Sequence, residues 1–341
     1  MMRAASYVGD RTFAVEERPS EELPLGHVRV RVAYTGVCGT DLHVFHGDMD
    51  QRVKPPTILG HEASGRIAEI GAGVSGWSEG DPVTVMPLIW CGECGTCKAG
   101  HVHICQHLNF VGLDSTGSMQ QLWSVPAGLL VRLPEDLPLQ HAALVEPVAV
   151  AVHDVRRARL QAGERTLVVG AGPIGTLIAA VALANDAQVL VSEPNSERRR
   201  IAAALGLETV DPTTTDLQAH VEEWTDGDGA AVAFEVSGSA AGLGAATQAL
   251  APRGRLVVVG IHPHPVPMDL FRIFWRELNV IGARVYERPD FERAVELLHS
   301  GAIPADALIS RIEPLSKVLD AFTALDAGGD VMKILIDCQE A

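Results

Sequence analysis

The stretch Thr166-Leu-Val-Val-Gly-Ala-Gly-Pro-Ile-Gly175 decides the fold, because an apolar run leads directly into a glycine-rich turn. The apolar run predicts a short buried strand, and the apolar residues that follow the turn predict a helix. Strands are also predicted at 188–193, 231–236 and 255–260, with a helix near 196–205. Strands that alternate with helices in this way indicate an α/β fold, with a parallel sheet covered on both faces.

The glycine-rich turn has the spacing of a dinucleotide-binding site. Its Gly-x-Gly-x-x-Gly pattern permits a tight turn and a close approach of pyrophosphate, and the next helix offers free N–H groups at its start. Glu193, at the end of the second strand, can accept hydrogen bonds from the adenosine ribose and would repel a 2′-phosphate, which favours NAD over NADP. The residues 198–200 are all arginine and weaken this preference, unless they form a solvated helix face. The predicted cofactor-binding residues of this segment are Gly170, Gly172, Pro173, Ile174, Gly175, Glu193 and Arg198, the last of which could stack on adenine.

The rest of the chain lacks this regular alternation of strands and helices. Residues 28–32 and 65–70 alternate with period two, as half-buried strands do, and the first 135 residues or so are predicted to be mostly β. Helices are predicted at 291–300 and 315–325, before a last strand at 333–336. A length of 341 residues predicts two domains.

Charge and hydropathy exclude several classes of partner. Lys and Arg total 27 and Asp and Glu total 43, a formal charge of −16, so nucleic acids and anionic membranes are not expected as partners. We find no apolar run of about 18 residues that would predict a membrane span. The start of the sequence has no apolar core of the signal-peptide type, and a cytoplasmic protein is expected.

Four of the six cysteines lie close together, in the spacing Cys-x2-Cys-x2-Cys-x7-Cys. In a cytoplasmic chain such clustering indicates metal ligands rather than disulfides. Four thiolates complete a tetrahedral zinc shell and leave no open position, so the expected site is structural. Free surface thiols and an iron–sulfur cluster are the alternatives. The predicted ligands are Cys91, Cys94, Cys97 and Cys105.

Other candidate metal ligands are far apart in the sequence. Cys38, the pair His61 and Glu62, and Glu146 come from three separate segments. Taken singly, each has a structural explanation: a buried thiol, a core histidine with satisfied hydrogen bonds, or a carboxylate at a domain edge. Their spacing alone does not bring them together.

A family resemblance connects these segments. Gly60-His-Glu-x2-Gly-x5-Gly-x2-Val74 resembles the zinc signature of the medium-chain dehydrogenase/reductase superfamily, and Cys38-Gly-Thr-Asp-x-His43, the cysteine cluster and the glycine-rich turn follow that family's order. Within the superfamily the chain is similar to the polyol dehydrogenase branch, which includes sorbitol, butanediol and threonine dehydrogenases. Leu144-Val-Glu-Pro147 indicates this branch, because in the classical alcohol dehydrogenases the third zinc ligand is a cysteine in place of this glutamate.

The resemblance implies a role for each of these residues. Cys38, His61 and Glu62 would hold a catalytic zinc, with Glu146 bound directly or through water. The resemblance leaves open which of the two glutamates is the direct ligand. Thr40 and His43 would relay a proton to solvent, which suits their side-chain chemistry. The nicotinamide half of the cofactor would contact four residues after the later strands of the sheet, namely Val259, Gly260, Ile261 and Arg284.

The resemblance also implies an activity and an architecture. The expected reaction is NAD-linked oxidation of a secondary alcohol in a polyol, vicinal diol, cyclitol or sugar-like substrate, with two zinc ions per chain, one catalytic and one structural. An amino alcohol such as threonine is an alternative substrate, and a non-catalytic NAD-binding protein of the crystallin or redox-sensor type is an alternative of another class. A GroES-like catalytic domain would comprise residues 1–150 and 285–341, and a Rossmann domain residues 151–284. A homodimer or homotetramer is expected.

Overall fold

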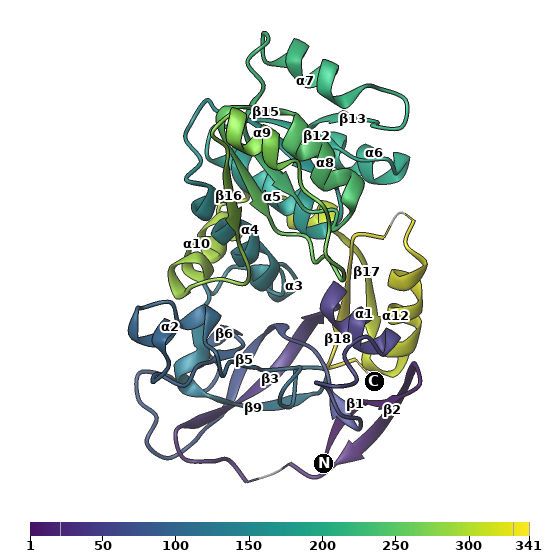
Figure 1. Ribbon diagram of the computed structural model, residues 1–341. Coiled ribbons are helices and arrows are strands. Elements are labelled where there is room, and N and C mark those ends of the chain that lie inside the picture. The colour runs from purple at the N-terminus through teal and green to yellow at the C-terminus, as the bar shows by residue number, and fades with distance from the viewer. Residues whose placement is uncertain (21, 330, 341) are drawn as a thin grey trace. The chain divides into compact units, whose positions relative to one another are not determined.

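The computed structural model describes residues 1–20, 22–329 and 331–340, and the chain divides into two compact units (Figure 1). Unit 1 comprises Met1–Glu146, Glu287–His299 and Leu308–Ala341, and unit 2 comprises Pro147–Tyr286 and Ser300–Ala307. Each unit has a sheet of its own. Helices α4 (Val145–Ala158) and α11 (Ala305–Leu308) cross the sequence boundaries between the units.

In the described part of unit 2, six parallel strands form one sheet in the order β13-β12-β11-β14-β15-β16. The strands are β11 (Arg165–Val169), β12 (Gln188–Ser192), β13 (Glu208–Val210), β14 (Ala230–Glu235), β15 (Leu250–Val258) and β16 (Asn279–Gly282). The helices of this unit are α5 (Pro173–Ala184), α6 (Ser196–Ala204), α7 (Leu217–Trp224), α8 (Ala240–Gln248) and α9 (Leu270–Trp275). The parallel sheet confirms the predicted α/β fold.

The sequence explains how this sheet begins. Strand β11 is followed by Gly170, whose φ of 106° is a conformation that side chains disfavour, and α5 starts at Pro173 with Gly172 as its N-cap. A Cβ on Gly175 would lie 1.9 Å from the Gly170 carbonyl oxygen, so the turn closes only with glycine there. Because β12 and β14 flank β11 on opposite sides, the strand order reverses at this point. Open α/β sheets bind their ligands beside such a reversal, outside the carboxyl ends of the strands.

Unit 1 is built around a long central strand, β3 (His27–Gly36). The described residues form a seven-stranded sheet in the order β10-β6-β5-β3-β18-β17, with β9 paired to β3. Its other strands are β5 (Glu62–Ile70), β6 (Pro82–Val85), β9 (Leu122–Pro126), β10 (Leu130–Arg132), β17 (Ile309–Pro314) and β18 (Lys333–Asp337). Smaller sheets contain β1 (Met2–Gly9), β2 (Thr12–Arg18) and β4 (Thr57–Ile58), and β7 (Leu88–Ile89) with β8 (Asn109–Phe110).

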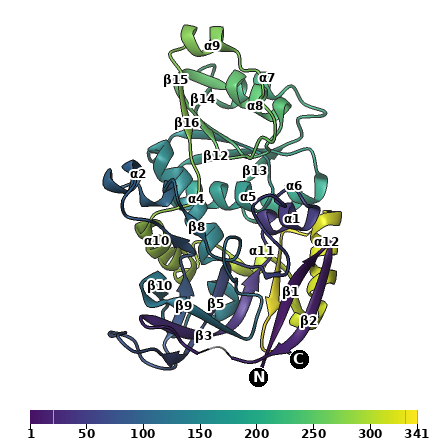
Figure 2. The same cartoon turned by 60° about the horizontal axis from the view of Figure 1, so that its bottom comes forward.

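Short helices complete unit 1. They are α1 (Gly39–His46), α2 (Gly95–Lys98), α3 (Leu139–Ala142), α10 (Arg288–His299) and α12 (Val318–Ala327), with 3-10 turns at Val102–Ile104, Ala127–Leu129 and Leu315–Lys317. The helix predicted at 315–325 therefore begins as a 3-10 turn. Figure 2 shows α12 beside β1 and β2, where the rings of Phe13 and Phe322 are 4.6 Å apart.

The last strand returns to the middle of unit 1. Strand β18 pairs antiparallel with β3, with Leu335 opposite Gly36, and this places Lys333 near the loop that follows β3. The mostly β character predicted for the first 135 residues agrees with this unit. Among the described residues, no helix is long and apolar enough to cross a membrane.

Candidate functional site

Three predicted ligands meet in unit 1. A sulfur of Cys38, a ring nitrogen of His61 and a carboxylate oxygen of Glu62 all lie within 4.8 Å of one another. Cys38 follows β3, and Glu62 opens β5 opposite Gly36 in the strand register. A Cβ on Gly36 would lie 2.0 Å from a Glu62 oxygen, so glycine at this position makes room for the carboxylate. His61 and Glu62 are fully buried.

The structure adds Lys333, which the sequence analysis did not select. Its Nζ donates to both oxygens of Glu62 at 2.7 Å and to the Val37 carbonyl at 3.2 Å. Burial is the largest single influence and lowers the pKa of Lys333, but Glu62, Cys38 and Glu146 together outweigh it, so the pKa is raised. The only sequence feature that could have identified Lys333 is its place at the start of the mostly apolar strand 333–336. Snorkelling to solvent is the ordinary interpretation of such a lysine.

Asp41 is a second buried neighbour that the sequence analysis did not select. Its Oδ2 accepts the Cys38 N–H at 2.9 Å, and its Oδ1 lies 3.6 Å from His61 Nδ1. Burial is the largest single influence and lowers the pKa of His61, but Asp41, Cys38 and Glu146 together outweigh it, so the pKa lies well above the usual value for histidine. A carboxylate on the Nδ1 side leaves Nε2 to face a metal, as in many metal sites.

The donor set of this cluster fits a zinc ion. It offers a thiol, an imidazole and a carboxylate, which are the ligand types that zinc takes in proteins. Asp41 Oδ1 and His61 Nδ1 are buried 3.6 Å apart, and neither has a hydrogen-bond partner among the described residues. Phe110 covers one side, with its ring edge-on to His61 at 5.0 Å.

The remaining predicted residues of this centre are placed differently. Glu146, at the start of α4, lies outside the 4.8 Å group, although it is buried and its charge raises the pKa of His61 and of Lys333. Thr40 and His43 both lie on α1. The His43 ring is half exposed, and its Nδ1 lies 3.0 Å from Asp48 Oδ2, a partner that the sequence analysis did not identify.

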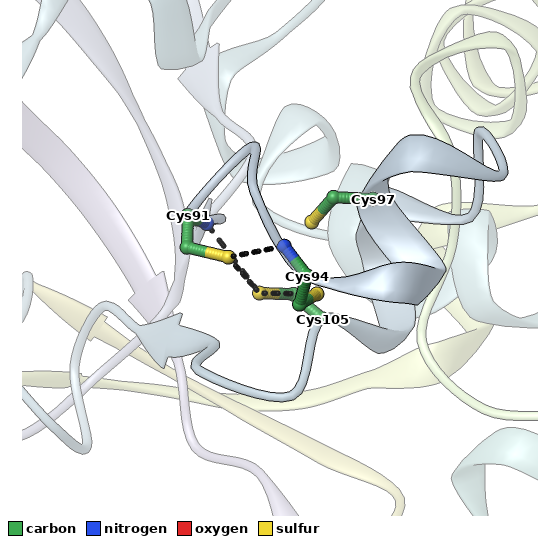
Figure 3. A group of neighbouring side chains, drawn as sticks. All are labelled: Cys91, Cys94, Cys97 and Cys105. Atoms are coloured by element: carbon green, nitrogen blue, oxygen red, sulfur yellow. Dashed lines mark hydrogen bonds between the residues drawn. The ribbon is translucent and has the colours of Figure 1, made fainter.

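The four clustered cysteines converge, as Figure 3 shows. The sulfurs of Cys91 and Cys105 are 3.5 Å apart, and those of Cys94 and Cys105 are 3.8 Å apart. Four sulfurs at about 2.3 Å from a tetrahedral zinc would be about 3.8 Å from each other, so the spacing fits such an ion. Hydrogen bonds from Thr96 and from backbone N–H groups lower the pKa of Cys94 to about 5, whereas burial raises that of Cys97 to about 12.

In unit 2, Glu193 lies against the glycine-rich turn. Its Oε2 accepts the Ala171 N–H at 2.7 Å and its Oε1 accepts the Asn195 N–H at 2.8 Å, while the residue is almost fully buried. Both oxygens retain lone pairs that could accept hydrogen bonds from hydroxyl groups. The carboxylate is thus fixed at the end of β12, the position where the sequence pattern predicts ribose recognition.

The three arginines at 198–200 make different contacts. Arg199 bonds to the Glu193 carbonyl at 2.7 Å and to Asp211 at 2.9 Å, and Arg200 pairs with Glu197 on the surface. Arg198 instead lies over the turn, with one guanidinium nitrogen 4.0 Å from the place where a Gly172 Cβ would be. Its Nε is buried with no hydrogen-bond partner among the described residues.

The predicted nicotinamide contacts follow the ends of two strands. The N–H groups of Val259 and Gly260 donate to the Glu235 carbonyl oxygen, and Ile261 is exposed. Arg284, beyond β16, is exposed and precedes Val285, whose φ of 49° is rare for a β-branched residue.

Comparison with known proteins places this geometry in a family. Residues 24–135 match the alcohol dehydrogenase GroES-like domain, and residues 173–300 match the zinc-binding dehydrogenase domain. A 2-dehydro-3-deoxy-L-galactonate 5-dehydrogenase from Pseudoalteromonas atlantica is 50% identical over 99% of both chains. The chain belongs to the zinc-dependent medium-chain dehydrogenases. The polyol dehydrogenase branch and the combination of GroES-like and Rossmann-like folds, both expected from the sequence, are confirmed.

Solved structures agree with this assignment. The crystal structure of 2R,3R-butanediol dehydrogenase from Bacillus subtilis matches with a TM-score of 0.93 and 32% identity, over 99% of both chains. A zinc-binding dehydrogenase from Sinorhizobium meliloti 1021, bound to NADP, matches with a TM-score of 0.92 and 31% identity, again over 99% of both chains. The chain described in this structure is therefore an alcohol-oxidising dehydrogenase that uses zinc and a nicotinamide cofactor.

The Glu62–Lys333 pair generates a stability prediction for the dehydrogenase. In the zinc-free protein, replacing Lys333 by Met leaves the Glu62 carboxylate buried without a cation, and the free energy of unfolding should fall by about 3 to 5 kcal/mol. Denaturant unfolding measures this change. The double variant Lys333→Met with Glu62→Gln removes the buried charge and should recover most of the loss. Equal losses in the single and double variants would show that the charge is not the cause.

Proposed function

We propose that the chain oxidises a secondary hydroxyl group of a sugar acid, or of a closely related polyol, to a ketone with NAD as acceptor. The observation that carries this proposal is the convergence of the half-buried Cys38 with the buried His61 and Glu62. Identity of 50% over 99% of both chains to a 2-dehydro-3-deoxy-L-galactonate 5-dehydrogenase supports a sugar acid as the substrate class.

We assign the ligand and proton-transfer roles as follows. Cys38, His61 and Glu62 hold the catalytic zinc, with Glu146 as a further carboxylate beside them. The zinc, when bound, acts as a Lewis acid that makes a hydroxyl group easier to deprotonate. Thr40 and His43 pass the released proton toward solvent, and the half-exposed ring of His43, oriented by Asp48, is the outer end of that path. The four cysteines at 91–105 hold a second, structural zinc.

Metal content and activity together test these assignments. Cys38→Ser should lower the zinc content from about two ions per chain to one and abolish NAD reduction, because its thiolate ligand is lost. Zinc is measured by mass spectrometry, and NADH absorbance is followed with 2-dehydro-3-deoxy sugar acids, polyols, cyclitols and L-threonine.

Two further variants are the controls. Cys97→Ser should lose the other zinc and lower the melting temperature, while Cys338→Ser, a buried thiol outside both clusters, should keep both ions and full activity. A Cys38→Ser protein that stays active contradicts the catalytic zinc. Turnover of L-threonine in preference to every sugar acid contradicts the substrate class.

We infer a preference for NAD over NADP. The buried Glu193 carboxylate lies where a 2′-phosphate would be repelled. Two of the neighbouring arginines are occupied by Asp211 and Glu197, which leaves Arg198 beside the turn.

Replacing Glu193 by Ala removes the repulsion and the ribose acceptor together. The ratio of kcat/KM for NAD to that for NADP should fall about ten-fold or more, since one lost charged contact is typically worth that factor. Steady-state kinetics with both cofactors measure the ratio. Glu208→Ala, which removes an exposed carboxylate from the neighbouring strand β13, should leave it unchanged. An unchanged ratio in Glu193→Ala would overturn the preference argument.

We further infer that the chain forms a homo-oligomer through unit 2. Strand β16 is the edge of the parallel sheet, and its residues are largely exposed. Helix α9, just before it, exposes Leu270, Phe271, Phe274 and Trp275. An unpaired edge beside an apolar patch is completed by an equivalent edge and patch on a second copy, related by a twofold axis.

Charges placed in this patch should separate the copies. Phe271→Glu combined with Phe274→Glu should shift the protein from dimer or tetramer toward a smaller species in sedimentation velocity, because two carboxylates would be buried against their own copies. Leu25→Glu, at an equally exposed leucine in unit 1, is the control and should leave the assembly unchanged. A wild-type monomer would contradict this interface.

A further inference from the structure

A buried carboxylate in unit 2 has no part in the roles assigned so far. Glu235, the last residue of β14, is fully buried. Its Oε1 accepts hydrogen bonds from Ser237 Oγ at 2.6 Å and from the Gly238 N–H at 3.0 Å, and its Oε2 lies 2.9 Å from His262 Nε2. His262 comes after β15, so this pair joins the loops that follow two neighbouring strands.

The main chain reinforces the same junction. The Glu235 carbonyl oxygen accepts the N–H groups of Val259 and Gly260 at 3.0 and 2.9 Å. A Cβ on Gly260 would lie 2.5 Å from the Gly238 nitrogen and 2.7 Å from Glu235 Oε2, so the two loops touch only because glycines meet there. Glu235 therefore holds the segment 259–262 at both ends: its carbonyl binds the start and its carboxylate binds His262.

The segment beyond His262 is stiff. Prolines at 263, 265 and 267 fix their own φ angles and restrict the residues before them, while Val266 and Met268 pack on the hydrophobic core of unit 2. Movement of this segment therefore depends on its attachment at His262. The attachment leaves His262 Nδ1 buried without a hydrogen-bond partner in the described residues, so packing alone does not explain a histidine there.

The junction lies where a dinucleotide is expected. Glu235 ends the strand next to β11, and a Cβ on Gly170 would lie 3.1 Å from the Ser237 nitrogen, so the glycine-rich turn borders the same loop. Ligands of parallel sheets bind at such a reversal of strand order. We propose that Glu235 and His262 are positioning residues, which hold Val259–Ile261 in place for the nicotinamide half of the cofactor. This proposal rests on the proposed NAD-linked function.

Binding of whole and partial cofactor tests the proposal without turnover. In His262→Ala the dissociation constant for NADH should rise about ten-fold, the effect of one lost charge-assisted hydrogen bond. ADP-ribose lacks the nicotinamide ring, and its dissociation constant should change less than two-fold. Titration calorimetry measures both ligands. Glu235→Gln keeps the shape of the side chain and should show the same selective loss if His262→Ala folds poorly.

Two matched variants serve as controls. His264→Ala, at an exposed histidine of the same segment, should bind both ligands as the wild type does, and His262→Gln, whose amide can still donate to Glu235, should recover part of the NADH affinity. Equal weakening of NADH and ADP-ribose would mean a general loss of structure and would overturn the positioning role, as would unchanged NADH affinity. A wild-type protein that binds neither ligand contradicts the proposed function itself.

Discussion

The ion pair between Glu62 and Lys333 ties together three segments of unit 1 that are far apart in the sequence. It fixes the start of β5 against the start of β18, and both strands flank β3, which leads into the Cys38 loop. Burying two charges is costly unless each is fully satisfied, and here Nζ reaches both carboxylate oxygens and a carbonyl. The positions of Cys38 and His61 depend on this pair, because a shift of either strand would leave a charge unpaired in the interior.

The sequence predicted the parts of the molecule whose chemistry is local. The glycine-rich turn and the four cysteines each lie within a short segment, so their spacing along the sequence was enough to predict how they are arranged. Cys38 and His61 lie in separate segments, and only a family resemblance connected them before the strand register did. Asp41, Asp48 and Lys333 were missed because each acts through a partner side chain. An ordinary aspartate or lysine carries no signal of that kind in a single sequence.

Electrostatics at the cofactor site work against the charge of the whole chain. A net charge of −16 repels an anionic dinucleotide at long range. The positive groups near the glycine-rich turn are the start of α5 and Arg198, since Arg199 and Arg200 are already paired with carboxylates. In the proposed mode of binding, affinity for the dinucleotide would therefore come from a few fixed donors at short range, against the long-range field of the chain.

Lys333 follows Glu62 by 271 residues, and this order has a consequence for biosynthesis. A growing chain presents Cys38, His61 and Glu62 long before Lys333 has been translated. The continuous segment 147–286 of unit 2 can complete its core in that interval, because domains generally fold as units during synthesis. The core of unit 1 is complete only once β18 has been made, since the Glu62 carboxylate pairs with Lys333 of that strand. Translation of β18 therefore sets the moment at which the Glu62–Lys333 pair can form.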